Sequence, residues 1–110
     1  MRVYVPGTLA LLGDWVRAGA VAGDAGHLTS PDDTEESEYD TLLEAADASA
    51  ALLPGAGRRV VVVAETSSTG AIPLRDVVAV HADTEDVDPA DEDPPELGWF
   101  ATQEIDDLLA

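Results

Sequence analysis

The sequence predicts an α/β (or α+β) fold, with a single small sheet of three to four strands and about three helices packed on it. Two short runs rich in valine, at 59–64 and 77–82, have the composition of strands. Two longer segments, 9–18 and 35–53, repeat apolar residues at the helical spacing of three and four. Hydrophobic residues make up 45% of the 110 residues. That share is ordinary for a globular protein, so 1–110 is expected to form a single domain.

The N-terminal segment is predicted to form a strand and then a helix. Residues 1–5 contain alternating apolar side chains, and the Pro-Gly pair after them ends the strand. Thr8 is placed to cap a helix over 9–18 with its hydroxyl group, and Gly19 is placed to end that helix. A strand of two or three residues is expected at 27–29, within the loop that follows.

The second helix is predicted over 35–53. Ser30 is expected to cap its entrance, with Pro31 in the first turn. Carboxylates gather near this end, where the helix dipole is positive and stabilises them. The Pro-Gly pair at 54–55 ends the helix. An apolar stripe is expected to pack against the sheet: Tyr39, Leu42, Leu43, Ala46, Ala50 and Leu53.

The clearest strand is the run of four valines within 59–64. Its apolar residues do not alternate with polar ones, which predicts a central strand that is buried on both faces. The strand at 77–82 comes next and carries His81 near its end. The predicted order of elements is β-α-(β)-α-β-β-α, where the bracketed strand is the short one at 27–29.

An acidic run separates this last strand from the C-terminal segment. Eight of the fourteen residues at 83–96 are carboxylates, and three prolines interrupt them. The run has no structural period, so we predict a mobile loop within the domain. Pro95 is expected to open the final helix. The apolar face of that helix is predicted to consist of Leu97, Phe100, Ala101, Ile105, Leu108 and Leu109.

Net charge limits the classes of partner. The chain carries a formal charge of −18, with five arginines and no lysine. Such a charge disfavours direct binding to nucleic acid, because contacts with phosphate groups need basic side chains. It also disfavours anionic membrane surfaces, and no run is long and apolar enough to span a bilayer. The absence of cysteine excludes disulfides and fits a reducing compartment, so the expected location is cytoplasmic.

Motif tests exclude several kinds of site. The acidic run fails as a calcium-binding loop, because Asp91 stands where the EF-hand turn requires glycine. The stretch at 67–70 follows a strand but lacks the Gly-Lys ending of a phosphate-binding loop. No serine or threonine has a histidine and an acid in a recognisable triad arrangement. We therefore predict no cofactor and no metal ion. Whether the protein is an enzyme stays open, although the residues favour a protein without enzymatic activity.

Four residues remain as candidates for a functional site. His81 and Asp83 lie two positions apart, so their side chains point to the same face of a strand and can form an acid–base pair. Glu104 is an acid inside a strongly apolar segment. The alternative is that His81 has no functional role and is simply exposed to solvent at the end of a strand. Trp99 lies off the apolar stripe of the last predicted helix, so it is either an anchor for a partner or a core residue.

The two ends of the chain resemble a known family. The opening Met-Arg-Val-Tyr-Val-Pro, followed by Thr-Leu-Ala-Leu-Leu at 8–12, is similar to the start of a family of small actinobacterial hypothetical proteins of unknown function. The close at 99–105, Trp-Phe-Ala-Thr-Gln-Glu-Ile, resembles the ending of the same family, and the strand patterns near 60 and 80 also fit it. The resemblance supports the fold prediction and implies no activity. Abundant Ala, Asp, Glu and Arg without lysine also fits a genome of high GC content.

The interpretation that fits these observations best is an uncharacterised, soluble intracellular domain that binds another protein or associates with itself and is not an enzyme. A single-sign field steers basic partners toward such a surface and repels acidic ones. The alternative is a small metal-dependent or acid–base enzyme that uses His81, Asp83 and Glu104. A third hypothesis is that the charge reflects only adaptation to salt or solubility.

Overall fold

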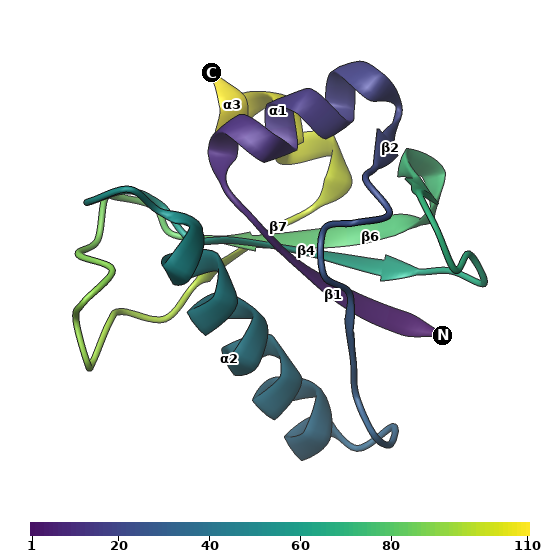
Figure 1. Cartoon of the computed structure of the whole chain (residues 1–110), viewed down its shortest axis with the longest axis horizontal. Coiled ribbons are helices and arrows are strands. Elements are labelled where there is room, and N and C mark those ends of the chain that lie inside the picture. The colour runs from purple at the N-terminus through teal and green to yellow at the C-terminus, as the bar shows by residue number, and fades with distance from the viewer.

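The computed structural model describes all residues from 1 to 110 and has a mixed α+β fold (Figure 1). Its main sheet has five strands in the order β3-β1-β4-β6-β7, and every neighbouring pair is antiparallel. Two further strands, β2 and β5, pair with each other in a small second sheet. The strands are β1 (Arg2–Gly7), β2 (Ala20–Val21), β3 (Leu28–Thr29), β4 (Val60–Glu65), β5 (Ile72–Pro73), β6 (Val77–Ala82) and β7 (Gly98–Phe100).

Three α-helices flank the main sheet: α1 (Leu9–Ala18), α2 (Glu35–Leu52) and the short α3 (Ile105–Leu109). In Figure 1, α1 and α3 lie above the sheet and α2 lies below it. Two single-turn 3-10 helices, η1 (Leu74–Asp76) and η2 (Thr102–Glu104), precede β6 and α3. The prediction of three helices packed on a mixed fold is confirmed. The predicted single sheet of three to four strands is wrong, because the main sheet has five strands and a second sheet is present. The predicted order β-α-(β)-α-β-β-α also lacks the strands β2, β5 and β7.

The first helix forms as its sequence predicts. Thr8 accepts a hydrogen bond from the backbone N–H of Leu11 at 3.1 Å, which satisfies one of the free donors at the helix start. Gly19 ends the helix in the left-handed region, with φ of 80°, and its N–H bonds to the carbonyl of Trp15. Glycine adopts this conformation without the penalty that a Cβ would bring.

The second helix begins at the predicted residue and ends one residue earlier than predicted, and its cap differs from the predicted one. Thr34, not Ser30, accepts the hydrogen bond from the N–H of Ser37. Asp32 in turn accepts hydrogen bonds from the N–H and hydroxyl groups of Thr34, and these bonds lower the pKa of Asp32. Ser30 instead bonds to the carbonyl oxygen of Asp32, so residues 30–33 form a turn outside the helix.

The C-terminal segment is where the sequence prediction is wrong. Instead of a helix beginning at Pro95, residues 98–100 form the edge strand β7, and the α-helix begins only at Ile105. The register places Phe100 opposite Val80 and Trp99 opposite His81. The apolar spacing of 97–109 fits a helix, but hydrogen bonding to the neighbouring strand β6 determines the structure of its first part.

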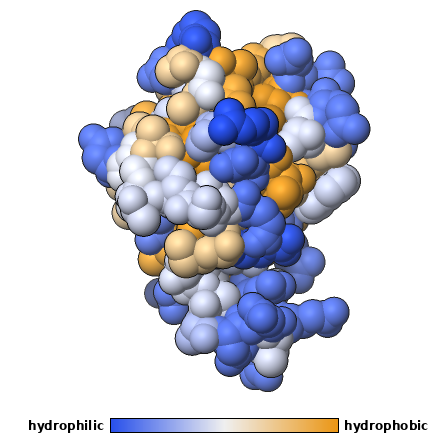
Figure 2. Space-filling view, turned by 90° about the vertical axis from the view of Figure 1, so that its right-hand side faces the viewer, coloured by the Kyte–Doolittle hydropathy of each residue, from blue (hydrophilic) through white to orange (hydrophobic).

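The two faces of the main sheet carry two separate clusters of core residues. On the face covered by α1, α3 and the β2–β5 pair, which we call the closed face, thirteen buried side chains form one cluster. It includes Leu12 and Trp15 of α1, Leu108 of α3 and valines of β1, β4 and β6. On the side shown in Figure 2, hydrophobic residues gather in the upper half, which holds α1 and the β2–β5 pair.

On the other face, which we call the open face, only five buried side chains cluster: Tyr4, Ala45, Ala46, Val61 and Val63. Helix α2 packs there over β3, β1 and β4. Ser49 fastens it, because its hydroxyl donates to the carbonyl of Gly7 at 2.7 Å and accepts from the N–H of Val60 at 2.8 Å. Both partners sit at the ends of paired strands, so this one side chain joins α2 to β1 and β4.

Candidate functional site

A groove lies on the open face, between α2 and the part of the sheet formed by β6 and β7. It exists because α2 packs on β1 and β4 and leaves the next two strands without a helix over them. Its volume is about 640 Å³, within the range of sites that bind small molecules or side chains of a partner. Its lining is Tyr39, Leu42, Leu43, Ala46, Asp47, Arg59, His81, Leu97, Trp99 and the segment 92–96.

The floor of the groove is built by cross-strand neighbours. Val61 of β4 pairs with His81 of β6, which pairs with Trp99 of β7. Residues directly opposite each other on antiparallel strands point to the same face. Val61 is buried beneath α2, whereas Trp99, two strands further out, is 61% exposed. The indole ring is therefore presented on the uncovered part of the sheet.

One flank of α2 forms the wall. Tyr39 and Leu43 lie four residues apart, so they stand one above the other on the helix, and they are 50% and 46% exposed. The residues that α2 buries against the sheet are small, namely Thr41, Ala45, Ala46 and Ser49. Small side chains let the helix approach the strands closely. The predicted apolar stripe is thus rotated: part of it lines the groove and is not packed in the core.

A buried ion pair closes one end of the groove. The carboxylate of Asp83 accepts bonds from Nε and Nη2 of Arg59 at 2.8 and 2.7 Å, and from the backbone N–H of Arg59 at 2.8 Å. The side chains are only 6% and 2% exposed. Nη2 also donates to the carbonyl of Pro95 at 2.6 Å, so the pair holds the end of the acidic run against the sheet.

A second contact fixes the middle of the acidic run. Val87 is buried, and its backbone exchanges hydrogen bonds with Gly57 at 2.8 and 3.0 Å. Beyond this contact, the last part of the run, residues 92–96, lines the groove. Its side chains Glu92, Asp93 and Glu96 are exposed there. The mobility predicted for 83–96 stays a prediction.

Carboxylates surround the apolar lining. Asp47 on α2 and the three acids of the segment 92–96 line the groove, and all are exposed. The one basic side chain in the lining, Arg59, is already paired with Asp83. A negative charge is therefore neutralised by a positive one only at the end of the groove, in the pair of Arg59 and Asp83. The rest of the rim presents a negative field to any ligand that approaches.

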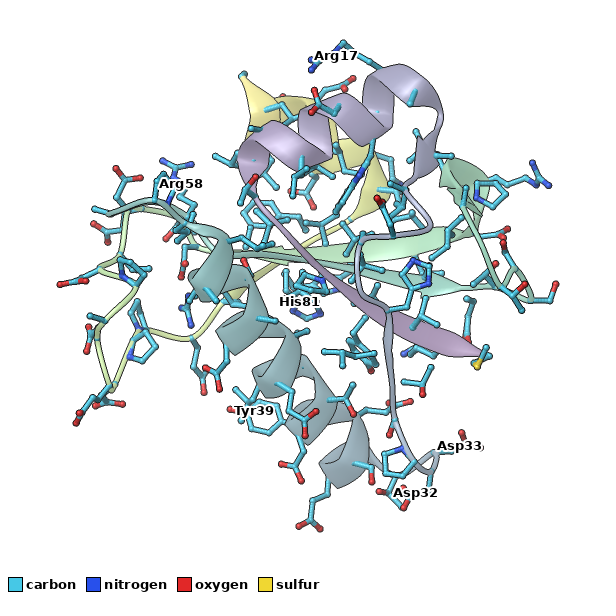
Figure 3. The ribbon with its side chains drawn as sticks, in the orientation of Figure 1. Arg17, Asp32, Asp33, Tyr39, Arg58 and His81 are labelled. Carbon is cyan, nitrogen blue, oxygen red and sulfur yellow. The ribbon has the colours of Figure 1, made fainter.

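His81 is half-buried in this groove, and burial lowers the pKa of its imidazole below the usual value of 6.5, because the charged form loses hydration. The ring is therefore neutral at physiological pH. A neutral imidazole offers one hydrogen-bond donor and one acceptor to a ligand, and can act as a base when a substrate lies within reach. Figure 3 shows His81 on the α2 side of the sheet and Tyr39 on the flank of that helix.

The structure separates the three residues predicted as an acid–base group. His81 and Asp83 share the open face, as their spacing predicts, but both oxygens of Asp83 are engaged by Arg59. Glu104 lies in η2 and lines a different, smaller pocket with Arg58 and Phe100. Its carboxylate accepts a bond from the N–H of Ala101 at 3.0 Å.

No group of three or more histidine, cysteine, aspartate or glutamate side chains is placed to hold a metal ion. None of the helices is both long enough and apolar enough to cross a membrane.

Tyr39 and Leu43 were predicted to pack in the core, and Arg59 was not among the predicted residues of a functional site. A signal for the helix residues exists: the small residues Thr41, Ala45 and Ser49 recur every four positions and define the face that packs closely. Arg59 and Asp83 each flank a valine-rich strand by one residue, which suits a pair at the shared end of neighbouring antiparallel strands.

Trp99 is the one predicted partner-binding residue, and it is the most exposed aromatic side chain of the groove. Comparison with known proteins adds family membership to this geometry. No curated protein and no solved structure matches the sequence. A family model described as a family of unknown function, DUF6912, matches residues 1–109, which is nearly the whole chain. The chain therefore belongs to the DUF6912 family.

Proposed function

We propose that this protein is a non-enzymatic module that binds a protein partner in the groove beside α2. The observation that carries the proposal is the exposed aromatic and apolar lining formed by Trp99, Tyr39 and Leu43 on a surface that the fold leaves uncovered. Tryptophan and tyrosine are enriched among the residues that dominate binding energy at protein interfaces. An apolar patch rimmed by polar side chains is typical of an interaction surface.

The partner is either another protein or a second copy of this chain, and charge favours the former. Each copy carries −18, so two copies repel each other at every approach. Salt distinguishes the two cases. Self-association strengthens as salt screens this repulsion, whereas binding of a basic partner weakens.

The alternative, a metal-dependent or acid–base enzyme using His81, Asp83 and Glu104, has less support. A general base needs a second group that shares its substrate, and Glu104 lines another pocket. The support for catalysis that remains is the neutral imidazole of His81 in the groove.

Composition supports two further parts of the proposal. We expect the protein to act in the cytoplasm, because it has no cysteine to form the disulfides typical of oxidising compartments. We expect an actinobacterial source, because the two ends of the chain resemble a family of small actinobacterial proteins and because arginine without lysine fits a genome of high GC content. Direct contact with nucleic acid is not expected, since the groove offers no unpaired arginine to a phosphate group.

The test is selection from a random library of displayed peptides on the immobilised protein. Enriched peptides should bind at least about tenfold more weakly to Trp99→Ala and Tyr39→Ala, because these variants remove the aromatic lining. Leu52→Ala is the matched control, since Leu52 is a similarly exposed apolar residue of α2 outside the groove. Size-exclusion chromatography at low and high salt reports any self-association.

Peptides that bind Trp99→Ala and Tyr39→Ala as well as they bind the wild type would overturn the groove as the binding surface. A library that yields no peptide, together with a monomer at every salt concentration, would also count against the proposal.

A further inference from the structure

The open face is wide enough for one more helix beside α2. Neighbouring strands lie about 4.8 Å apart and a helix with its side chains is about 10 Å wide, so one helix covers roughly two or three strands. Helix α2 occupies the half of this face over β3, β1 and β4. The half formed by β6 and β7 has the width of one more helix and carries the groove.

We propose that a basic amphipathic helix of a partner protein lies in the groove beside α2 and completes this layer. The inference rests on the proposed function and names the partner chemistry for the same site. The bound helix contacts Trp99 and His81 beneath it and the Tyr39–Leu43 flank of α2 beside it. Its apolar side chains face the groove, and its basic side chains face the carboxylates of the rim.

The placement of the apolar groups favours a helix over an added strand. A strand that pairs with the edge strand β7 meets only three residues, Gly98–Phe100, before the chain turns into η2. Such a short edge supplies few backbone hydrogen bonds. Trp99, Tyr39 and Leu43, by contrast, gather on the open face and not along the edge. A helix laid in a groove is the recognition mode that uses side chains on a face.

The charges define which helix is accepted. Asp47, Glu92, Asp93 and Glu96 surround the apolar lining, and an acidic or neutral helix gains nothing from them. Lysine and arginine on the two flanks of the partner helix pair with these groups and also speed its approach. A second copy of this chain offers no such helix. Helices α2 and α3 contain no arginine and no lysine, and the one basic residue of α1, Arg17, is paired with Asp14.

The length of the wall sets the length of the contact. Tyr39 and Asp47 mark its two ends and are eight residues apart on α2, which corresponds to about 12 Å along the helix axis. A partner helix therefore needs about two turns in contact, with apolar anchors at i, i+3 or i+4, and i+7.

The experiment is a two-dimensional NMR titration of the full-length protein with designed peptides of about 18 residues. The first peptide is an amphipathic helix of leucine and lysine. The second has the same composition in an order without amphipathic spacing, the third replaces lysine with glutamate, and the fourth carries a central proline that breaks the helix. The indole N–H signal of Trp99 reports on the groove, and that of Trp15, buried on the closed face, is the internal control.

The amphipathic basic peptide should shift the Trp99 signal and leave the Trp15 signal in place. Affinity should fall at least about tenfold for the peptides without amphipathic spacing, with glutamate or with proline. It should fall as much for Trp99→Ala, where the backbone amide signals of the groove replace the lost indole signal, and for Asp47→Asn/Glu96→Gln. It should also fall with added salt. Glu44→Gln/Asp106→Asn changes two acids outside the groove and should have little effect.

Two results overturn the helix while sparing the proposed function. One is equal binding of the proline and amphipathic peptides at Trp99, which indicates an extended partner. The other is selection, from the displayed library, of peptides that need the groove but carry no basic amphipathic pattern. If neither the designed nor the displayed peptides depend on Trp99, both proposals fail.

Discussion

The two faces of the main sheet differ in how completely they are covered. On the closed face, α1, α3 and the β2–β5 pair enclose a cluster of thirteen buried side chains, among them Leu12 and Trp15. On the open face, α2 alone covers part of the same strands and encloses five. The same sheet thus has a fully covered core on one face and a partly uncovered layer on the other.

This difference separates stability from binding. The closed face buries large side chains, so its residues account for most of the hydrophobic stabilisation. The open face keeps Trp99, Tyr39 and Leu43 partly in water, where their burial by a partner still yields free energy. Matched substitutions on the two faces test this division. The largest loss of stability is expected at the buried ion pair between Arg59 and Asp83, at the end of the groove.

Asp83→Asn should lower the free energy of unfolding by about 3–5 kcal/mol, because Arg59 is left buried without its carboxylate partner. Asp14→Asn is the control. Asp14 pairs with Arg17 on the surface of α1, where both side chains are more than 60% exposed, and its loss should change the stability by less than about 1 kcal/mol. Urea denaturation followed by circular dichroism measures both. Equal losses for the two variants would contradict the importance of the buried pair.

Leu12→Ala and Leu43→Ala compare the same chemical change on the two faces. Leu12 is among the largest fully buried side chains, and its truncation should cost about 2–5 kcal/mol. Leu43 is 46% exposed, so its truncation should cost less than about 1 kcal/mol. Thermal and urea unfolding give the two values. A loss for Leu43→Ala as large as that for Leu12→Ala would mean that the groove belongs to the core.

Gly7→Ala probes the packing density of the closed face. A Cβ added at Gly7 would lie 2.8 Å from Cη2 and 2.9 Å from Cζ3 of the Trp15 ring, which is buried and has little room to move. Overpacking of this kind should cost about 1–3 kcal/mol. A Cβ at Gly55 meets no atom within 4 Å, so Gly55→Ala should change the stability by no more than about 0.5 kcal/mol. Full stability of Gly7→Ala would show that this face is loosely packed.

His81 supplies the smallest expected effect. Burial lowers the pKa of its imidazole in the folded protein, so the unfolded chain takes up the proton first as the pH falls below about 6.5. The unfolded state then binds more protons, and stability decreases with falling pH in that range until the lowered pKa is passed.

In His81→Gln this contribution disappears, while the carboxylates titrate as before. The free energy of unfolding of the variant should therefore fall less between about pH 7 and pH 5 than that of the wild type. Parallel pH profiles for the two proteins would mean that the floor of the groove is as well hydrated as open solvent.

Several elements could be predicted from the sequence because their signals are local. The four valines of β4 indicated a strand buried on both faces, and β4 is indeed the central strand of the five. Helix α1 has the predicted bounds, since its cap at Thr8 and its stop at Gly19 are properties of neighbouring residues. The predicted strand at 77–82 coincides with β6.

Other features could not be predicted because they depend on contacts between distant residues. The edge strand β7 has three residues and forms because β6 offers it a pairing partner. The two-residue strands β2 and β5 are about fifty positions apart and carry no period of their own. The cap of α2 is a different case, because it depends on a local contact: Asp32 accepts hydrogen bonds from the N–H and hydroxyl groups of Thr34, so Thr34 and not Ser30 caps the helix.

The sequence by itself determined the chemistry of the chain, which is acidic, has few aromatic residues and contains no cysteine and no lysine. It also determined the main strands and helices, whose propensities and caps are local. Only the tertiary structure decided that α2 stops short of β6 and β7, that Arg59 engages Asp83, and that Trp99 is exposed beside His81. These depend on strand order and on the depth to which small residues let α2 approach the sheet, and both are set by packing between segments far apart in the chain.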